Sequence, residues 1–148
     1  MNIKNIKVYH LFWFVAVIIL LIGIINPNET LDINIHDTYF VIGYLHVSFV
    51  LFLFYFLNGF GYWSIQKVIK KQLVKSLTLI HSVILIGNFI LYWVIFLYGK
   101  LFFTNHNSPL FDDFQFVNLA CSLGIVLTTF VALPVYIVNL LIVIFRNK

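Results

Sequence analysis

Two adjacent ionisable side chains, His36 and Asp37, stand in a polar stretch between two apolar segments. Together they could supply one nitrogen and one oxygen ligand to a divalent cation, and a partner chain or waters would have to complete the coordination. The alternative is a hydrogen-bonded turn, in which Asp37 or Thr38 accepts from the first-turn amides of the next helix. The cap is the commoner use of such residues, so by chemistry alone the sequence favours it.

His46 is a second candidate, because it lies within a long apolar run. If a helix begins at Asp37, then at about 1.5 Å per residue His46 lies roughly 13 Å below its start. An ionisable group that deep in a bilayer must face the helix bundle, a partner or a cofactor. A neutral imidazole can ligate haem iron. The alternative is a histidine that bridges two helices through a hydrogen bond. His10 and His81 lie near the other ends of their apolar runs, where interfacial histidines are ordinary.

Membrane helices must position these residues. Of the 148 residues, 62% are hydrophobic and 9% charged, whereas a water-soluble domain carries about 25% charged residues. Four charge-free runs each hold the ~20 apolar residues that a helix needs to cross a bilayer, and lipid leaves the backbone no other partners. We expect an all-α, four-transmembrane-helix bundle that forms one membrane domain over residues 1–148, with spans near 8–26, 39–64, 76–99 and 114–145. Pro134 is expected to disturb the last span.

The charged residues predict the orientation of these spans. With four spans, one side of the membrane receives Lys100 and all five carboxylates, and the other receives eight basic residues: Lys4, Lys7, Lys67, Lys70, Lys71, Lys75, Arg146 and Lys148. The excess of basic residues predicts that both termini are cytoplasmic and that the protein lies in the cell's inner (plasma) membrane. The basic loop is expected near anionic lipid headgroups rather than at a nucleic acid.

One segment resembles a known family. Residues 31–41 read L-D-I-N-I-H-D-T-Y-F-V, similar to the L-D-I-x-L-H-D-T-Y-[YF]-V signature of subunit I of the haem–copper oxidases, the cytochrome c and quinol oxidases. In that family the signature joins the ninth and tenth transmembrane helices on the outer side. It continues as V-A-H-F-H, whose two histidines ligate the high-spin and the low-spin haem. Here Tyr44 stands at the high-spin position and His46 at the low-spin position.

Further positions that are similar to the family pattern follow in the same order as in the family's last four helices. The later positions that are similar to the family pattern are Ile80-His81, Leu85 to Asn88, Asp112, Asn118, Ser122 and Gly124. The helices that carry the three copper-binding histidines and the second ligand of the low-spin haem have no counterpart here. The arginine pair that binds the haem propionates is also missing, since residues 99–113 contain no arginine. Copper is therefore not expected, and the chain is not expected to be an oxidase by itself.

The resemblance implies a haem-binding or respiratory-complex accessory subunit. His46 would ligate a b-type or a-type haem, with the second ligand supplied by a second copy or another membrane subunit. His36 and Asp37 would hold Mg²⁺ or Mn²⁺ at the outer loop, together with a partner's carboxylate. The alternative is a non-catalytic structural or interaction membrane protein that kept the fold without haem or metal.

Overall fold

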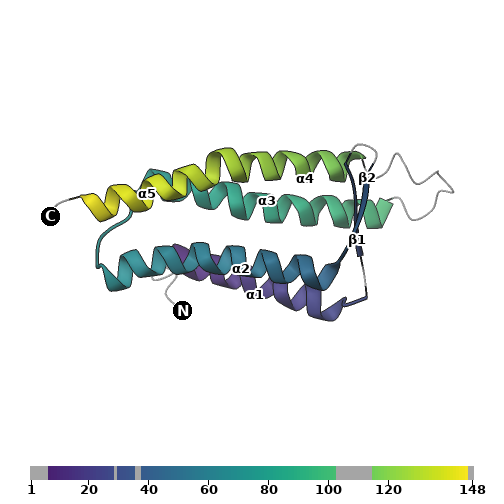
Figure 1. Ribbon diagram of the computed structural model, residues 1–148, viewed down its shortest axis with the longest axis horizontal. Coiled ribbons are helices and arrows are strands. Elements are labelled where there is room, and N and C mark those ends of the chain that lie inside the picture. Colours follow the sequence, from purple (N-terminus) through teal and green to yellow (C-terminus); the bar gives the residue numbers. More distant parts are fainter. Residues whose placement is uncertain (1–6, 29, 36–37, 103–114, 147–148) are drawn as a thin grey trace. The chain divides into compact units, whose positions relative to one another are not determined.

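The computed structural model describes residues 7–28, 30–35, 38–102 and 115–146 of the chain. Most of them are helical (Figure 1). The helices are α1 (Val8–Ile25), α2 (Tyr44–Trp63), α3 (Lys75–Phe102), α4 (Gln115–Leu127) and α5 (Leu133–Phe145). Two π-helical segments, η2 (Ser64–Val68) and η3 (Thr128–Ala132), continue α2 and join α4 to α5. Two strands, β1 (Thr30–Ile35) and β2 (Thr38–Gly43), lie between α1 and α2.

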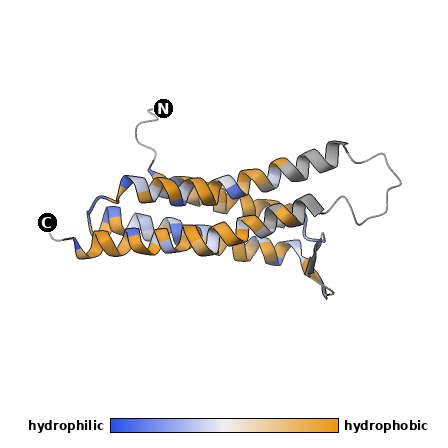
Figure 2. Cartoon of the chain, turned by 90° about the horizontal axis from the view of Figure 1, so that it is seen from above, coloured by the Kyte–Doolittle hydropathy of each residue, from blue (hydrophilic) through white to orange (hydrophobic). Residues whose placement is uncertain are grey.

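Three of the described helical stretches are long and apolar enough to cross a membrane: Val8–Ile25, Tyr44–Val68 and Ser122–Phe145. Apolar residues cover them along most of their length (Figure 2). A shorter apolar stretch, Lys75–Leu91, belongs to α3. The expected membrane-protein class is thus supported by helix length and composition.

The chain divides into two compact units. The first contains Met1–Val74 together with Asn139–Lys148, and the second contains Lys75–Val138. The main helix contacts within them are those of α1 with α2 in the first unit and of α3 with α4 and η3 in the second.

In the first unit, α1 and α2 pack as an antiparallel pair. Near one end the Phe12 ring lies 5.8 Å from the ring of Tyr62, and near the other end Gly23 lies against Ser48. The buried positions of α1 recur every three or four residues, as expected for one helix face: Tyr9, Phe12, Val15, Ala16, Ile19 and Gly23. This face is the packing surface of α1, and the remaining residues of the helix are half-buried or exposed.

The strands form an antiparallel hairpin, with Cα partners running from Thr30–Gly43 to Ile35–Thr38. In β1, Leu31, Ile33 and Ile35 alternate with polar residues, which is the period of a strand. The second span was predicted to begin at residue 39, but α2 begins at Tyr44. That boundary is wrong because residues 38–43 pair with β1 instead of entering the helix.

The second long helix ends in a widened turn. In η2 the N–H of Ile69 donates to the carbonyl of Ser64, five residues earlier. Lys70 then takes a left-handed backbone conformation with φ of 58°. Such a residue stops a helix, and the role usually falls to glycine. The chain turns here and continues into α3.

In the second unit, Pro134 lies one residue after the π-helical segment η3. Proline lacks an N–H, and its ring clashes with the carbonyl four residues earlier, which here belongs to Phe130. The N–H of Leu133 donates instead to Thr128, five residues back. The disturbance expected from Pro134 therefore takes the form of a π turn, which keeps the helix hydrogen-bonded.

Candidate functional site

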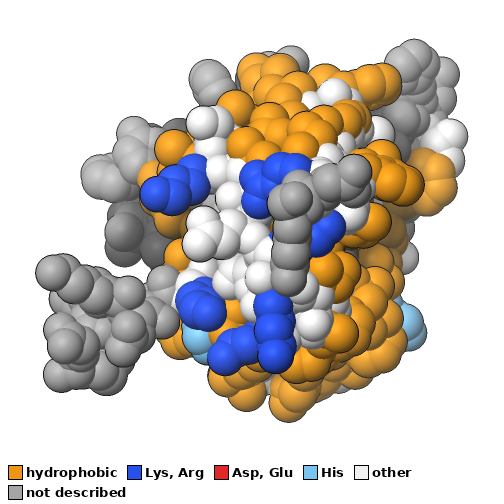
Figure 3. All heavy atoms as spheres, turned by 90° about the vertical axis from the view of Figure 1, so that its left-hand side faces the viewer, with side chains coloured by type: hydrophobic (Ala, Val, Ile, Leu, Met, Phe, Trp, Pro, Cys, Tyr) orange, Lys and Arg blue, Asp and Glu red, His pale blue; other side chains and the backbone are white. Residues whose placement is uncertain are grey.

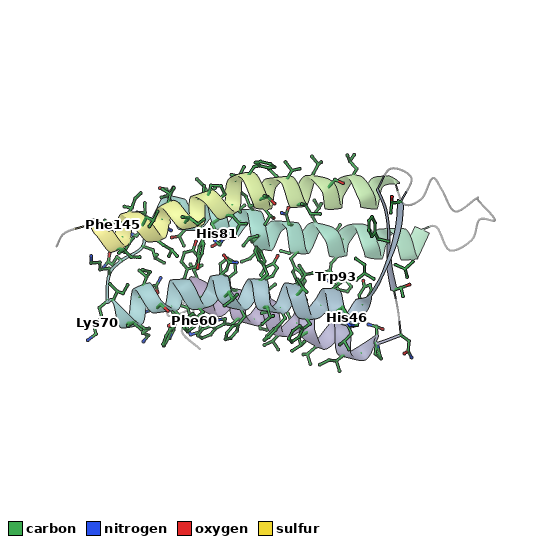
Figure 4. The ribbon with its side chains drawn as sticks, in the orientation of Figure 1. His46, Phe60, Lys70, His81, Trp93 and Phe145 are labelled. Atoms are coloured by element: carbon green, nitrogen blue, oxygen red, sulfur yellow. The ribbon has the colours of Figure 1, made fainter. Side chains whose placement is uncertain are left out.

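The hairpin end of α2 contains the predicted haem-ligand position. Because α2 begins at Tyr44, His46 lies in its first turn (Figure 4), about 3 Å along the axis from the helix start. The predicted depth of roughly 13 Å is wrong, since it assumed a helix through residues 38–43, which form β2. His46 is therefore a residue of the helix end and not of its middle.

The imidazole of His46 is exposed and lies beside Gly43. A Cβ on Gly43 would lie 3.2 Å from Nδ1 of His46, so the missing side chain leaves room for the ring. An exposed histidine does not bridge α1 and α2, so the predicted helix-bridging role is wrong within this unit. The ring is instead accessible to another molecule at the hairpin end.

Tyr44, which stands at the high-spin ligand position of the resemblance, is the first residue of α2 and is half-buried. Residues two apart on a helix do not face the same side. Tyr44 and His46 therefore do not form one joint site.

The predicted metal ligands His36 and Asp37 lie outside the described residues. For Thr38, the alternative role as a cap on the next helix is wrong, because the N-cap of α2 is Gly43. Thr38 is instead the first residue of β2. Within the described part of the chain, no group of three or more His, Cys, Asp or Glu side chains could hold a metal ion.

Within the first unit, the described histidines do not pair as the two axial ligands of one haem. His46 offers one imidazole at the hairpin end, whereas His10 lies at the opposite end of the α1–α2 pair. The Nδ1 of His10 accepts a hydrogen bond of 3.3 Å from the N–H of Lys7, which caps α1. Among the described residues of the first unit, no second imidazole lies near His46, and haem ligation by His46 stays a prediction.

His81 was expected to be an ordinary interfacial histidine, but it is fully buried in the second unit. Its ring stacks on Tyr136 of α5, with centroids 4.9 Å apart and planes inclined by 25°; His81 is labelled in Figure 4. Thr78 and Ser82 are buried beside it in sequence, and Leu85 completes the same helix face. The sequence carried this signal in the spacing of small and polar residues along α3, which is that of a packed helix face.

Asn88 makes polar contacts between α3 and the helical segment that it packs against. Its Nδ2 donates to the carbonyl of Gly124 and to Oγ1 of Thr128, both at 3.1 Å. A Cβ on Gly124 would lie 3.5 Å from the Asn88 side chain, so the small residue allows the close approach. Asn88 and Gly124 are both positions of the resemblance, and the structure brings them together as a packing contact.

No family model matches the chain, and no solved structure matches it. The resemblance to haem–copper oxidase subunit I therefore stays a prediction that depends on residues 31–46 and the later matches in order.

Proposed function

We propose that this chain is a non-catalytic structural or interaction protein of the membrane, which acts by contact with other membrane subunits or a second copy. The observation that carries the proposal is how the polar side chains of its helices are used. Asn88 donates to Gly124 and Thr128, and His81 stacks on Tyr136, so these groups hold neighbouring helices together. Such interhelical bonds are the ordinary polar contacts of membrane proteins.

The surface offered to a partner is the hairpin end of the first unit. An isolated two-stranded sheet is only marginally stable in water, and strand edges that are not paired within a sheet can pair with another chain. Phe40 and Val41 of β2 are exposed there, as is His46. A strand or helix of another membrane subunit would cover these apolar side chains.

Cross-linking tests this role. In a Cys121→Ser background, Val41→Cys is expected to form a specific adduct with a neighbouring chain in native membranes, whereas Leu79→Cys on the exposed face of α3 serves as the control. Equal, non-specific adducts at both positions would contradict a partner at the hairpin.

The proposed topology has four spans with both termini in the cytoplasm of a bacterial-type inner membrane. Its support is the eight-to-one distribution of basic residues and the length of α3, whose 28 residues extend about 42 Å. Single cysteines in the Cys121→Ser background test it. An impermeant maleimide is expected to label Asn107→Cys on intact cells, and Gln72→Cys only after permeabilisation. The reverse pattern would overturn the orientation.

A second candidate function is a haem-binding accessory subunit of a respiratory complex. It is favoured by the exposed imidazole of His46, which follows a segment that resembles the oxidase signature. The absorption spectrum of the membrane-extracted protein distinguishes the two functions. A Soret band that is lost in His46→Ala and kept in His10→Ala would establish haem ligation and refute the non-catalytic role. A colourless protein that is purified in complex with its partner would exclude the haem-binding function.

A further inference from the structure

The turn between η2 and α3 is fastened to the end of α5, within the first unit. The Nζ of Lys71 donates to the carbonyls of Ile144 and Arg146, at 2.8 and 2.9 Å. In return, Nη2 of Arg146 donates to the carbonyl of Gln72 at 3.2 Å. The last carbonyls of a helix lack partners within it, and a lysine ammonium is a good donor to them. These reciprocal bonds fix the turn and the helix end against each other.

A further hydrogen bond supports the same arrangement from inside. The N–H of Val74 donates to Oδ1 of the buried Asn139, at 3.1 Å. The backbone of Lys70 is held in its left-handed conformation next to these bonds. The backbone that carries the cationic side chains of the turn is therefore held in place by hydrogen bonds.

The fastened turn carries exposed positive charge. Lys67, Lys70 and Arg146 are exposed, and Lys7 belongs to the same end because α1 and α2 are antiparallel. Figure 3 looks at this end and shows Lys and Arg side chains gathered there. All five acidic residues of the chain lie elsewhere in the sequence, at Glu29, Asp32, Asp37, Asp112 and Asp113. A counter-ion is therefore expected from another molecule.

Apolar side chains alternate with these cations. Val68 and Ile69 lie between Lys67 and Lys70 and are 64% and 41% exposed, and Phe145, next to Arg146, is 76% exposed. Lys70 and Phe145 are labelled in Figure 4. A surface that offers cations and exposed hydrocarbon side by side matches a molecule with an anionic head and an acyl tail. An acidic protein or free phosphate would use only the cations.

We propose that this cationic turn, formed by Lys67, Lys70 and Arg146, binds the phosphate of an anionic phospholipid. Arg146 has five N–H donors and uses one of them on Gln72, which leaves donors that can bind phosphate oxygens. The two lysine ammonium groups add electrostatic attraction, and Val68, Ile69 and Phe145 contact the acyl chains. The inference rests on the membrane-spanning part of the proposed function, but not on which side of the membrane the turn faces.

Native mass spectrometry of the purified full chain in a neutral detergent tests the proposal. We expect phosphatidylglycerol to bind and phosphatidylcholine to bind at least tenfold more weakly. The electrostatic attraction between one lysine and an anionic lipid corresponds to about a fivefold change in affinity. We therefore expect Lys70→Gln to weaken phosphatidylglycerol binding about fivefold, and Lys67→Gln together with Lys70→Gln to weaken it about 25-fold. Inorganic phosphate is expected not to compete at millimolar concentration. Lys71 and Arg146 remain in these variants, so the turn stays fastened.

Lys100→Gln is the matched control, because it removes one positive charge near the other end of α3. It is expected to leave phosphatidylglycerol binding unchanged. Equal loss in Lys70→Gln and Lys100→Gln, or equal binding of the two lipids, would overturn the proposal. Displacement of the lipid by inorganic phosphate would also overturn it, in favour of a phosphate site. Labelling of the introduced cysteines tests the topology separately, so failure of one proposal is distinguishable from failure of the other.

Discussion

Gly23→Ala is expected to force apart the antiparallel pair of α1 and α2. A Cβ at this position would lie 2.5 Å from Oγ of Ser48, whereas ordinary contacts begin at 3.4 Å. The backbones must therefore separate by about 1 Å, and overpacking of this kind costs about 1–3 kcal/mol. Alanine regains up to ~1 kcal/mol over glycine in a helix. The net loss of unfolding free energy is expected to be about 1–2 kcal/mol.

The assay is unfolding of the purified protein in mixed micelles, followed by tryptophan fluorescence. Trp13 of α1 is a suitable reporter, because its ring stacks on Phe56 of α2 with centroids 6.0 Å apart. Gly87→Ala is the matched control: no atom lies within 4 Å of the Cβ that it would introduce. It is expected to leave stability unchanged or to raise it by up to ~1 kcal/mol.

A compensating substitution makes the test specific. Ser48→Gly removes the atoms that the new methyl group meets, and the next neighbour, Cα of Leu45, lies at 3.6 Å, which is ordinary contact. In the Gly23→Ala background it should restore close packing, with a coupling energy of about 1 kcal/mol or more. Equal stability of Gly23→Ala and Gly87→Ala, or additive effects of the two substitutions at this contact, would refute the packing of α1 against α2 at this point.

Three further predictions concern the other contacts. Asn88→Leu removes the bonds to Gly124 and Thr128, and is expected to lower the unfolding free energy by about 0.6–1.7 kcal/mol; no loss in the same assay would contradict that role. Lys70→Gly relieves the left-handed φ of 58° and should raise the unfolding free energy by about 1 kcal/mol; lower stability would show that the turn is not left-handed. His46→Ala removes an exposed ring and should change stability by less than ~0.5 kcal/mol; a larger loss would indicate that the ring is buried.

The helices could be predicted from the sequence because their signal is local. The absence of charge over some 20 residues marked the first span at 8–26, and α1 occupies Val8–Ile25. The start of α2 could not be found in this way. The run T-Y-F-V-I-G is apolar enough for a helix and β-rich enough for a strand, so periodicity does not separate the two. The deciding interaction is the pairing with β1, whose alternation of Leu31, Asp32, Ile33, Asn34 and Ile35 was the overlooked signal.

The burial of His81 illustrates a different limit. The position of His81 near the end of an apolar run is compatible with a hydrated membrane interface. Its burial becomes evident only from the residue that packs on its ring. That partner, Tyr136, lies far along the chain and stacks on the ring from α5. The contact depends on how α3 meets the last helix, which no short window of sequence contains. The spacing from Thr78 to Leu85 places these residues on one helix face, but it does not show what covers that face.

The π segment ahead of Pro134 acts as a phase shift in the last long helix. One residue more in a turn rotates everything downstream by about 100° around the helix axis. Thr128 lies at the start of this segment and accepts a bond from Asn88, whereas Asn139 beyond it accepts from Val74. Removing a single residue between Thr128 and Asn139 would leave the apolar stretch long enough to cross a bilayer. It would also rotate the side chain of Asn139 away from the N–H of Val74. A hydropathy profile would not reveal such a deletion, although the side chains beyond it would point in a different direction.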